Sequence, residues 1–273
     1  MRRDGGGMSN APHLSRLVGS ALLLALPVAI GSTPPGGAAT PDASPSVLVS
    51  RFTTFYPSGE RRVINIHRAA QLLDGTVLVP GQRFSMNAAL GRRTKARGFV
   101  PAPMISAGVL VNSVGGGISQ VATTLYNAAF LAGLKLIAHT PHSFYISRYP
   151  MGREATISWG GPELIFQNDW QAPLTTRLRT TGTSITVAFY SQRLGRSVST
   201  ETTPPYGYVR PRTRYVKDPT LPRATRIVLQ HAGGSGFSVD YSRRVLESAR
   251  LRRDERFHVH YDAVDEVIAI SGR

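Results

Sequence analysis

Three consecutive glycines followed by a helical pattern constrain the fold more than any other part of the chain. Gly115, Gly116 and Gly117 precede apolar and small residues at helical spacing, and Gly133 stands where a helix C-terminal cap belongs. The recurring residues are Ile118, Val121, Ala122, Leu125, Tyr126, Ala129 and Ala132. The pattern predicts a helix with one face in the core and its N-terminus exposed by the glycines. A second helix is predicted from Ile64 to Leu73.

Most other signals before residue 195 are for strands. Short strands are predicted at Thr156–Trp159 and Leu164–Phe166. A hairpin is predicted from Leu174–Arg179 and Ser184–Tyr190, with its turn at residues 181–183. The sequence therefore predicts an α+β fold, in which a buried helix packs on antiparallel strands.

The rest of the chain divides into two parts. Prolines interleaved with arginines over residues 196–225 predict a linker or an extended arm. Residues 226–273 contain alternating apolar positions, such as Phe237, Val239 and Tyr241, which predict a small C-terminal all-β module. Residues 47–195 are the main domain in this interpretation.

The N-terminus has the three parts of a secretory signal. Arg2, Arg3 and Arg16 precede or flank an apolar run from Leu17 to Ile30, and small residues follow up to position 39. A membrane-spanning helix needs about 20 apolar residues, whereas this run is shorter and contains a proline. Residues 1–39 are therefore predicted to be a cleaved signal peptide of a secreted protein. Membrane contact is expected only if this segment is retained.

Composition restricts the partners and the chemistry. The chain has no cysteine, which excludes disulfides, zinc–thiolate sites and thiol nucleophiles. The formal net charge is +16, and removing residues 1–39, with three arginines and one aspartate, leaves +14. This charge attracts polyanions, which for an exported protein are anionic wall polymers and lipid rather than nucleic acid. The sequence does not specify an oligomeric state.

Three residues have the chemistry of an acyl-transfer site. Ser119 opens the long predicted helix, where the free amides of residues 116–120 and the helix dipole would stabilise an oxyanion. His142, restricted by the proline before it, is the candidate base, and Glu154 is the candidate for orienting it. In the alternative interpretation Ser119 caps the helix and His142 bonds within a turn.

A second pattern resembles a metal site. His258, His260 and Asp262 form the His-x-His-x-Asp motif of binuclear zinc hydrolases, but Ala263 replaces the histidine that should follow. Alternation along a strand puts the three side chains on one face, where polar residues are expected in any case. The sequence therefore predicts no metal site and no cofactor.

Ordered blocks give the main domain a resemblance to the VanW family. The blocks cover most of residues 47–169 and include Phe52–Thr54, Arg62–Ile66, Val79–Asn87, Leu90–Thr94, Gly115–Ala128, His142–Ser143, Gly152–Thr156 and Phe166–Asp169. The tail resembles, more loosely, a glycine-rich β module often appended to wall proteins. The resemblance implies a ligand-binding set of Gly115, Gly116, Gly117, Gln120, Thr123, Asn87 and Arg92.

The resemblance also implies a place in the cell envelope. The family is named after accessory genes of vancomycin-resistance clusters, and its members are exported or membrane-tethered. Some VanW-type domains are associated with peptidoglycan cross-linking of the L,D-transpeptidase kind, through a cysteine in the glycine-rich motif. Ser119 stands at that position here, and Glu154 stands where the commoner pattern has aspartate.

Two hypotheses follow from the sequence. In the first, the protein is an enzyme that transfers or hydrolyses acyl groups of wall peptides, with Ser119 as nucleophile, His142 as base and Glu154 beside them. In the second, it is a non-catalytic wall-binding or scaffolding protein that uses the same pocket for recognition. Peptidoglycan or an anionic wall polymer is the partner in both.

Overall fold

The computed structural model describes residues 46–106, 109–192 and 195–272. The predicted signal peptide, residues 1–39, lies outside the described residues. All described residues belong to one unit of the chain, Ala43–Arg273. Among these residues, no helix has the length and the apolar character needed to cross a membrane.

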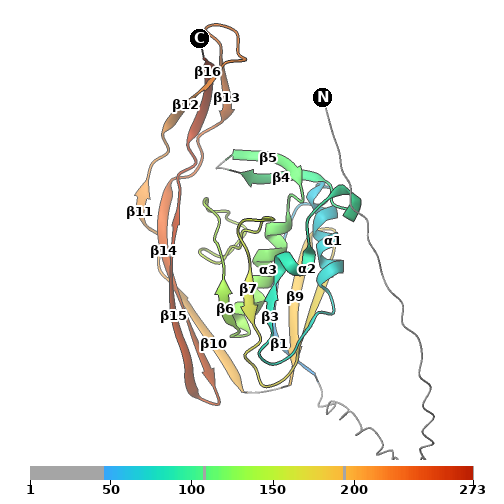
Figure 1. Cartoon of the computed structure of the whole chain (residues 1–273). Coiled ribbons are helices and arrows are strands. Elements are labelled where there is room, and N and C mark those ends of the chain that lie inside the picture. The colour runs from blue at the N-terminus through green and yellow to red at the C-terminus, as the bar shows by residue number, and fades with distance from the viewer. Residues whose placement is uncertain (1–45, 107–108, 193–194, 273) are drawn as a thin grey trace, which may run out of the picture. The chain divides into compact units, whose positions relative to one another are not determined.

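The main sheet has four antiparallel strands and carries the predicted helices (Figure 1). Its order is β1 (Val47–Phe55), β9 (Ser184–Ser191), β8 (Leu174–Thr180) and β2 (Val77–Leu78). Helix α3 (Ile118–Leu131) packs on β1 and β9, and α1 (Arg62–Leu73) packs on β8 and α3. Both helices and the hairpin of β8 and β9 confirm the sequence predictions.

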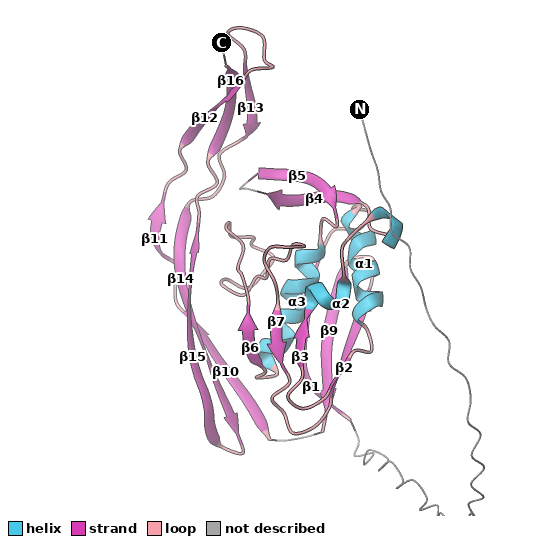
Figure 2. Cartoon of the chain, in the orientation of Figure 1, coloured by secondary structure: helices cyan, strands magenta, loops and turns pink. Residues whose placement is uncertain are grey.

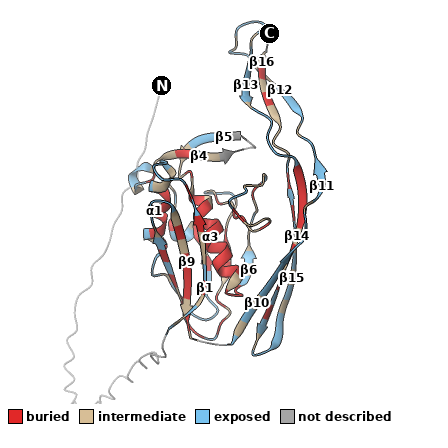
Figure 3. Cartoon of the chain, turned by 180° about the vertical axis from the view of Figure 1, so that it is seen from behind, coloured by how far each residue is buried: buried red, intermediate tan, exposed pale blue. Residues whose placement is uncertain are grey.

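Helix α3 is buried more completely than its pattern predicts. Twelve of its 14 residues are buried, so the helix lies inside the core rather than against one side of it (Figure 3). Its buried polar side chains have partners. The Thr124 hydroxyl donates to the Gln120 carbonyl at 2.7 Å, and Asn127 Nδ2 donates to the Thr123 carbonyl at 2.8 Å.

Smaller elements complete the main domain (Figure 2). A three-stranded antiparallel sheet has the order β3 (Arg83–Ser85), β7 (Ile165–Gln167) and β6 (Lys135–Ala138). Strands β4 (Pro101–Ser106) and β5 (Val109–Val114) pair with each other, and α2 (Met86–Leu90) and a 3₁₀ turn, Lys95–Arg97, precede them. Strand β7 corresponds to the one predicted at Leu164–Phe166. The strand predicted at Thr156–Trp159 is wrong, because these residues form a loop that is bonded to Thr140 and Pro162.

The remainder of the chain, residues 196–272, is called the tail and consists of strands. Strand β14 (Gly236–Glu247) pairs with β15 (Arg250–Tyr261), β10 (Arg196–Thr202) and β11 (Tyr206–Val209), all antiparallel. A second sheet has the order β12 (Thr213–Asp218), β16 (Glu266–Ser271) and β13 (Arg226–Gln230), with β12 parallel to β16.

The structure differs from the predicted linker over residues 196–225. Strands β10, β11 and β12 lie within it and pair with strands of residues 226–273. The prolines that suggested a linker, Pro204, Pro205, Pro211, Pro219 and Pro222, all fall in the connections between these strands. A proline there costs no ladder hydrogen bond, so the pattern marked the turns of a sheet.

The inner face of the tail shares the core of the main domain. Phe237, Val239 and Tyr241 from β14 are buried in the same apolar cluster as α3. The Tyr241 hydroxyl lies 2.9 Å from that of Tyr126 on the helix. This arrangement extends the core into the tail, so the two parts are held by packing as well as by polar contacts.

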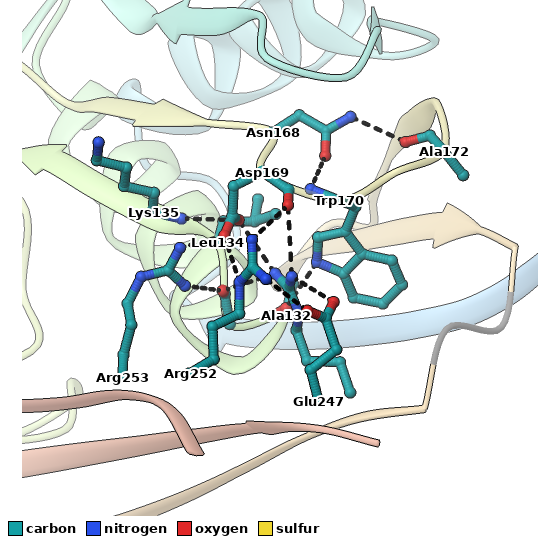
Figure 4. Close-up of polar contacts among 12 residues, drawn as sticks. Ala132, Leu134, Lys135, Asn168, Asp169, Trp170, Ala172, Glu247, Arg252 and Arg253 are labelled. Atoms are coloured by element: carbon teal, nitrogen blue, oxygen red, sulfur yellow. Dashed lines mark hydrogen bonds and ion pairs between the residues drawn. The ribbon is translucent and has the colours of Figure 1, made fainter. Parts of the chain in front are cut away.

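An ionic cluster centred on Asp169 joins the tail to the main domain (Figure 4). The Asp169 carboxylate pairs with Arg196 at 3.0 Å, with Arg252 at 3.2 Å and with Arg253. Glu247 pairs with Arg196 and Arg252 at 2.7 and 2.6 Å. Three arginines of the tail are thereby fixed by two carboxylates, one of which comes from the main domain.

Candidate functional site

The glycine run positions the start of α3 by close backbone packing. Gly115 and Gly117 have φ of +93° and +96°, which few side chains tolerate. A Cβ on Gly116 would overlap the carbonyl oxygen of Ala102 on β4. The Gly116 carbonyl accepts from Asn65 Nδ2 at 2.9 Å. Gly115 and Gly116, predicted to bind ligand, therefore shape the turn.

The amides of this turn are largely used by the backbone. Those of Gly116, Ile118 and Gln120 donate to the carbonyls of Ser113, Gly115 and Gly117 at 3.1, 3.2 and 3.0 Å. Three of the five amides predicted for an oxyanion hole are thus already occupied in this state of the protein.

Ser119 lies in the first turn of α3 and lines a cavity. The helix is capped by Gly117, and the Ser119 hydroxyl makes no capping bond. Instead, its Oγ accepts from the backbone N–H of Ile157 at a long 3.4 Å. Among the described contacts, no hydrogen bond joins Ser119 to a histidine. The capping alternative is therefore wrong, and in the described structure Ser119 makes no direct hydrogen bond to His142, the candidate base.

His142 lines the same cavity as Ser119. It is 9% exposed, and its Nδ1 is buried without a hydrogen-bond partner in the described structure. Burial, with a smaller effect of His139, lowers the pKa of His142 to about 4. The imidazole is therefore neutral at physiological pH and free to accept or donate a hydrogen bond.

Glu154 is placed differently from the prediction. Its side chain is fully buried, and its two carboxylate oxygens accept from the Tyr261 hydroxyl at 2.9 and 2.7 Å. Burial raises the pKa of Glu154 to about 7, although the Tyr261 hydrogen bond opposes the shift. The described contacts join this carboxylate to the tail and not to His142, so the structure does not support an orienting role.

The cavity is large and lies where the main domain meets the tail. Its volume is about 1520 Å³. It is lined by the start of α3, the β4–β5 hairpin, residues 140–149 and 156–158, and parts of the tail near Arg210, Asp262 and Asp265. Of the predicted site residues, Gly117, Ser119, Gln120 and His142 line it.

Arginines dominate the charge of this cavity. Six arginines and three carboxylates line it; the arginines are Arg61, Arg62, Arg148, Arg210, Arg212 and Arg214. The side chains of Arg148, Arg210, Arg212 and Arg214 are exposed and have no hydrogen-bond or ion-pair partner among the described residues. The cavity therefore has an uncompensated positive charge toward solvent.

Gln120 and Thr123, both predicted to bind ligand, have structural roles. Gln120 accepts from Arg62 at 2.5 Å and donates to the Phe55 carbonyl at 3.0 Å. Thr123 Oγ1 accepts from the amide of Ala155 at 2.9 Å. These bonds tie α3 to β1, α1 and the loop that carries Glu154.

Asn87 and Arg92 lie outside the cavity lining. Asn87 Nδ2 donates to the Ser158 carbonyl at 3.0 Å, and its Oδ1 accepts from Arg93 at 2.5 Å. Arg92 is exposed, and its carbonyl accepts from Arg97 at 3.1 Å. Asn87 thus holds the loop before β7, and the described contacts of Arg92 involve only its own segment.

The sequence reasoning missed the arginines at the cavity. Arg148 follows the His142 segment, and Arg210, Arg212 and Arg214 alternate along the chain. This period of two was visible in the sequence and indicates side chains on one face of an extended segment. The predicted linker assignment concealed it.

The comparisons with known proteins find matches to the main domain. Residues 61–190 match the family model described as VanW like protein. The chain is 40% identical over 139 residues to the protein named "Uncharacterized protein YoaR" of Bacillus subtilis (strain 168). Residues 61–190 are therefore a VanW-like domain. The match to YoaR covers 51% of this chain and 46% of YoaR, so the chain matches less than half the length of that relative.

One solved structure aligns with part of the chain. The crystal structure of HP0197-G5 covers 28% of the chain and 96% of its own length, with 10% identity and a TM-score of 0.16. This score is too low to establish a shared fold. The likeness of the tail to glycine-rich wall modules remains a prediction.

Proposed function

We propose that this protein with a VanW-like domain is an exported cell-envelope protein that binds peptidoglycan fragments in the cavity. The observation that carries the proposal is the group of four unpaired arginines, Arg148, Arg210, Arg212 and Arg214, around one cavity. Guanidinium groups bind carboxylates through paired, charge-assisted hydrogen bonds. Peptidoglycan stem peptides carry several carboxylates, and an exported basic protein meets them at the wall.

The inner part of the cavity suits the rest of such a ligand. Ser119 and the buried, neutral His142 offer hydrogen bonds without a charge. Peptide amides need neutral donors and acceptors, whereas carboxylates need the arginines. A stem peptide can therefore place its acidic groups at the exposed arginines and an amide near Ser119.

Export is the second part of the proposal and rests on residues 1–39. Their basic start, apolar run and small residues at the end are those of a secretory signal. Residues 1–46 fused to a reporter that is active only outside the membrane should direct its secretion, with the mature N-terminus near Thr40. Recovery of the intact Leu17–Ile30 segment would identify an anchored protein instead.

Titration of purified muropeptides into the protein tests the binding proposal. The triple variant Arg210→Gln, Arg212→Gln, Arg214→Gln should bind at least about tenfold more weakly, because three charged contacts are lost. Arg179→Gln is the matched control, since this arginine is exposed on β8 and does not line the cavity. Equal affinities of the triple variant and the wild type would refute the proposal.

Acyl transfer is a second candidate, favoured by one observation. Ser119 and a neutral His142 line the same cavity, as a nucleophile and its base must. In such a step, Ser119 Oγ would form an ester with the peptide acyl group. His142 would take the hydroxyl proton and return it to the departing amine. An amine or water would then release the acyl group.

Muropeptide turnover separates the enzyme from the binding protein. If Ser119 is the nucleophile, Ser119→Ala should abolish turnover without unfolding the protein, and Ser119→Cys should retain or raise it. Turnover that persists in Ser119→Ala would refute the assignment. Absence of turnover in both the wild type and Ser119→Cys, with muropeptide binding intact, would leave the binding function alone.

A further inference from the structure

A buried hydrogen bond between Tyr261 and Glu154 joins the tail to the main domain beside the cavity. The Tyr261 hydroxyl, at the end of β15, donates to the Glu154 carboxylate and accepts from the Gly152 amide at 2.5 Å. Glu154 and Tyr261 both have 0% exposure. A contact this deep can change only when the two parts of the chain separate locally or when a proton moves.

The surroundings of Glu154 contain little to stabilise a negative charge. Among the described residues the carboxylate has no ion-pair partner, and the Tyr261 hydroxyl is its only partner outside its own residue. The titratable or charged groups around it are Tyr126 on α3, His139 after β6, Tyr145, Tyr149 and Arg153 in the loops, Tyr241 on β14 and Tyr261 on β15.

None of these neighbours compensates an ionised Glu154. Burial raises the pKa of Tyr145, Tyr149, Tyr241 and Tyr261, which stay uncharged. His139 bonds to the backbone carbonyl of Glu154, and burial lowers the pKa of this histidine to about 4. The Arg153 guanidinium lies over the Phe130 ring, 5.3 Å from its centroid. Ionisation therefore leaves a buried charge with one hydroxyl partner.

This contact is connected to the cavity on both sides. The next residue of the tail, Asp262, lines the cavity, and its amide donates to the Ser143 carbonyl at 2.7 Å. On the other side, the segment after Glu154 leads to Ile157, whose amide donates to Ser119 Oγ. Separation at Tyr261 would displace both a wall of the cavity and the residue that contacts Ser119.

We propose that the Glu154–Tyr261 contact is a proton-controlled latch, closed when Glu154 is protonated and loosened when it ionises. The latch controls whether the tail forms its wall of the cavity. Its effect on ligand binding rests on the proposed function, whereas its effect on the local opening of the chain does not. Acidic conditions would keep the site assembled, and alkaline conditions would favour local opening.

The expected pH dependence follows from proton linkage. In the closed state the pKa of Glu154 is about 7, compared with an ordinary value of 4.5. The closed state therefore binds the proton more tightly, and the contact loses stability as pH rises between these two values. The equilibrium for opening should increase about tenfold per pH unit from roughly pH 5 to 6.5 and become constant above roughly pH 7.5.

Hydrogen exchange of the full chain without ligand tests the latch directly. The amides of Gly152 and Asp262 report on opening, because each donates across the contact between the main domain and the tail. Their protection factors, corrected for intrinsic exchange, should fall about tenfold per pH unit in this window. The amide of Leu178, bonded to Asp74 within the main domain, is the control that should not show this fall.

Two variants separate the proton from the packing. Glu154→Gln keeps an acceptor for the Tyr261 hydroxyl but cannot ionise, so its protection factors should stay constant with pH. Tyr261→Phe removes the hydroxyl and should lower protection at Gly152 at every pH. A fall of the wild-type size in Glu154→Gln, or no fall in the wild type, would overturn the proposal.

The hydrogen-exchange test of the latch does not depend on whether muropeptides are the ligand. If the exchange data show the latch but muropeptides do not bind at pH 5.5, the proposed ligand is wrong and the latch stands. If muropeptides bind with the same affinity from pH 5.5 to 8 while the wild-type protection factors also stay constant, the latch is wrong and the proposed function stands.

Discussion

Arg243, in the middle of β14, offers the sharpest test of how the tail is held. Its side chain is fully buried. Its guanidinium donates to the carbonyls of Phe130 and Leu134 at 3.0 and 3.1 Å, pairs with Glu255 and lies 4.8 Å from the Phe130 ring centroid. Phe130 lies in the last turn of α3, where the helix dipole favours a cation, and its carbonyl also accepts from the Gly133 amide at 3.1 Å. Leu134 follows the helix.

Arg243→Ala should destabilise the protein by about 3–5 kcal/mol. Hydrogen bonds to charged groups contribute about 1.5–3 kcal/mol each, and the carbonyls of Phe130 and Leu134 would each lose the bond from Arg243, while Phe130 keeps the one from Gly133. Glu255 limits the loss, because its side chain is 25% exposed and regains water. Arg244→Ala is the matched control: the Arg244 side chain is 62% exposed and faces Asp254 at 3.4 Å, so a change within about 0.5 kcal/mol is expected.

Urea unfolding at neutral pH, followed by fluorescence and circular dichroism, measures both changes. Coincident transitions would justify a two-state free energy for each variant. If the tail separates first, the fluorescence and circular dichroism curves of Arg243→Ala should diverge. Equal midpoints for Arg243→Ala and Arg244→Ala would refute the argument that this buried arginine fixes the tail on α3.

The other predictions concern the turn and the ionic cluster. Gly116→Ala should destabilise the protein by several kcal/mol, because the new methyl group overlaps the backbone of Ala102. Gly182→Ala is the control, since Gly182 has open space around it and the change in stability should be less than about 1 kcal/mol. Thermal unfolding of the two variants measures the difference. At Asp169, burial favours a higher pKa, but the arginines Arg253 and Arg196 outweigh it and lower the pKa below 3.8. The ionised Asp169 carboxylate therefore stabilises the folded wild type at neutral pH, and this contribution should be lost as the pH falls through the lowered pKa of Asp169. Asp169→Asn has no such carboxylate, so its stability should fall less than that of the wild type over the same acid range.

The elements that the sequence predicted correctly are those specified by local pattern. Helix α3 follows from the period after Gly117, and the β8–β9 hairpin follows from alternation around a glycine turn. The tail strands β10 to β12 were mistaken for a linker. Their side chains are mostly exposed, so they give no alternation of apolar and polar residues, and the prolines between them dominated the interpretation.

The candidate site was predictable only in part, for a related reason. Ser119 and His142 were both identified, and they do line one cavity. The partner of Glu154 was not predictable, since Tyr261 lies 107 positions away and no local pattern relates the two. The same holds for the cavity arginines of the tail, whose place depends on how the tail pairs with and packs on the main domain.

Gly133 has two structural roles, and only one of them was predictable from the sequence. Its φ of +64° is what a glycine after a helix provides, and this role was predicted from its position. A Cβ here would also lie 2.8 Å from Val245 Cγ1 and 3.0 Å from Arg196 Cδ, both in the tail. The Gly133 carbonyl accepts from Arg196 and Arg253 at 3.0 and 2.9 Å. One glycine therefore ends α3 and also gives the tail room to approach, and only the first of these roles leaves a signal in the local sequence.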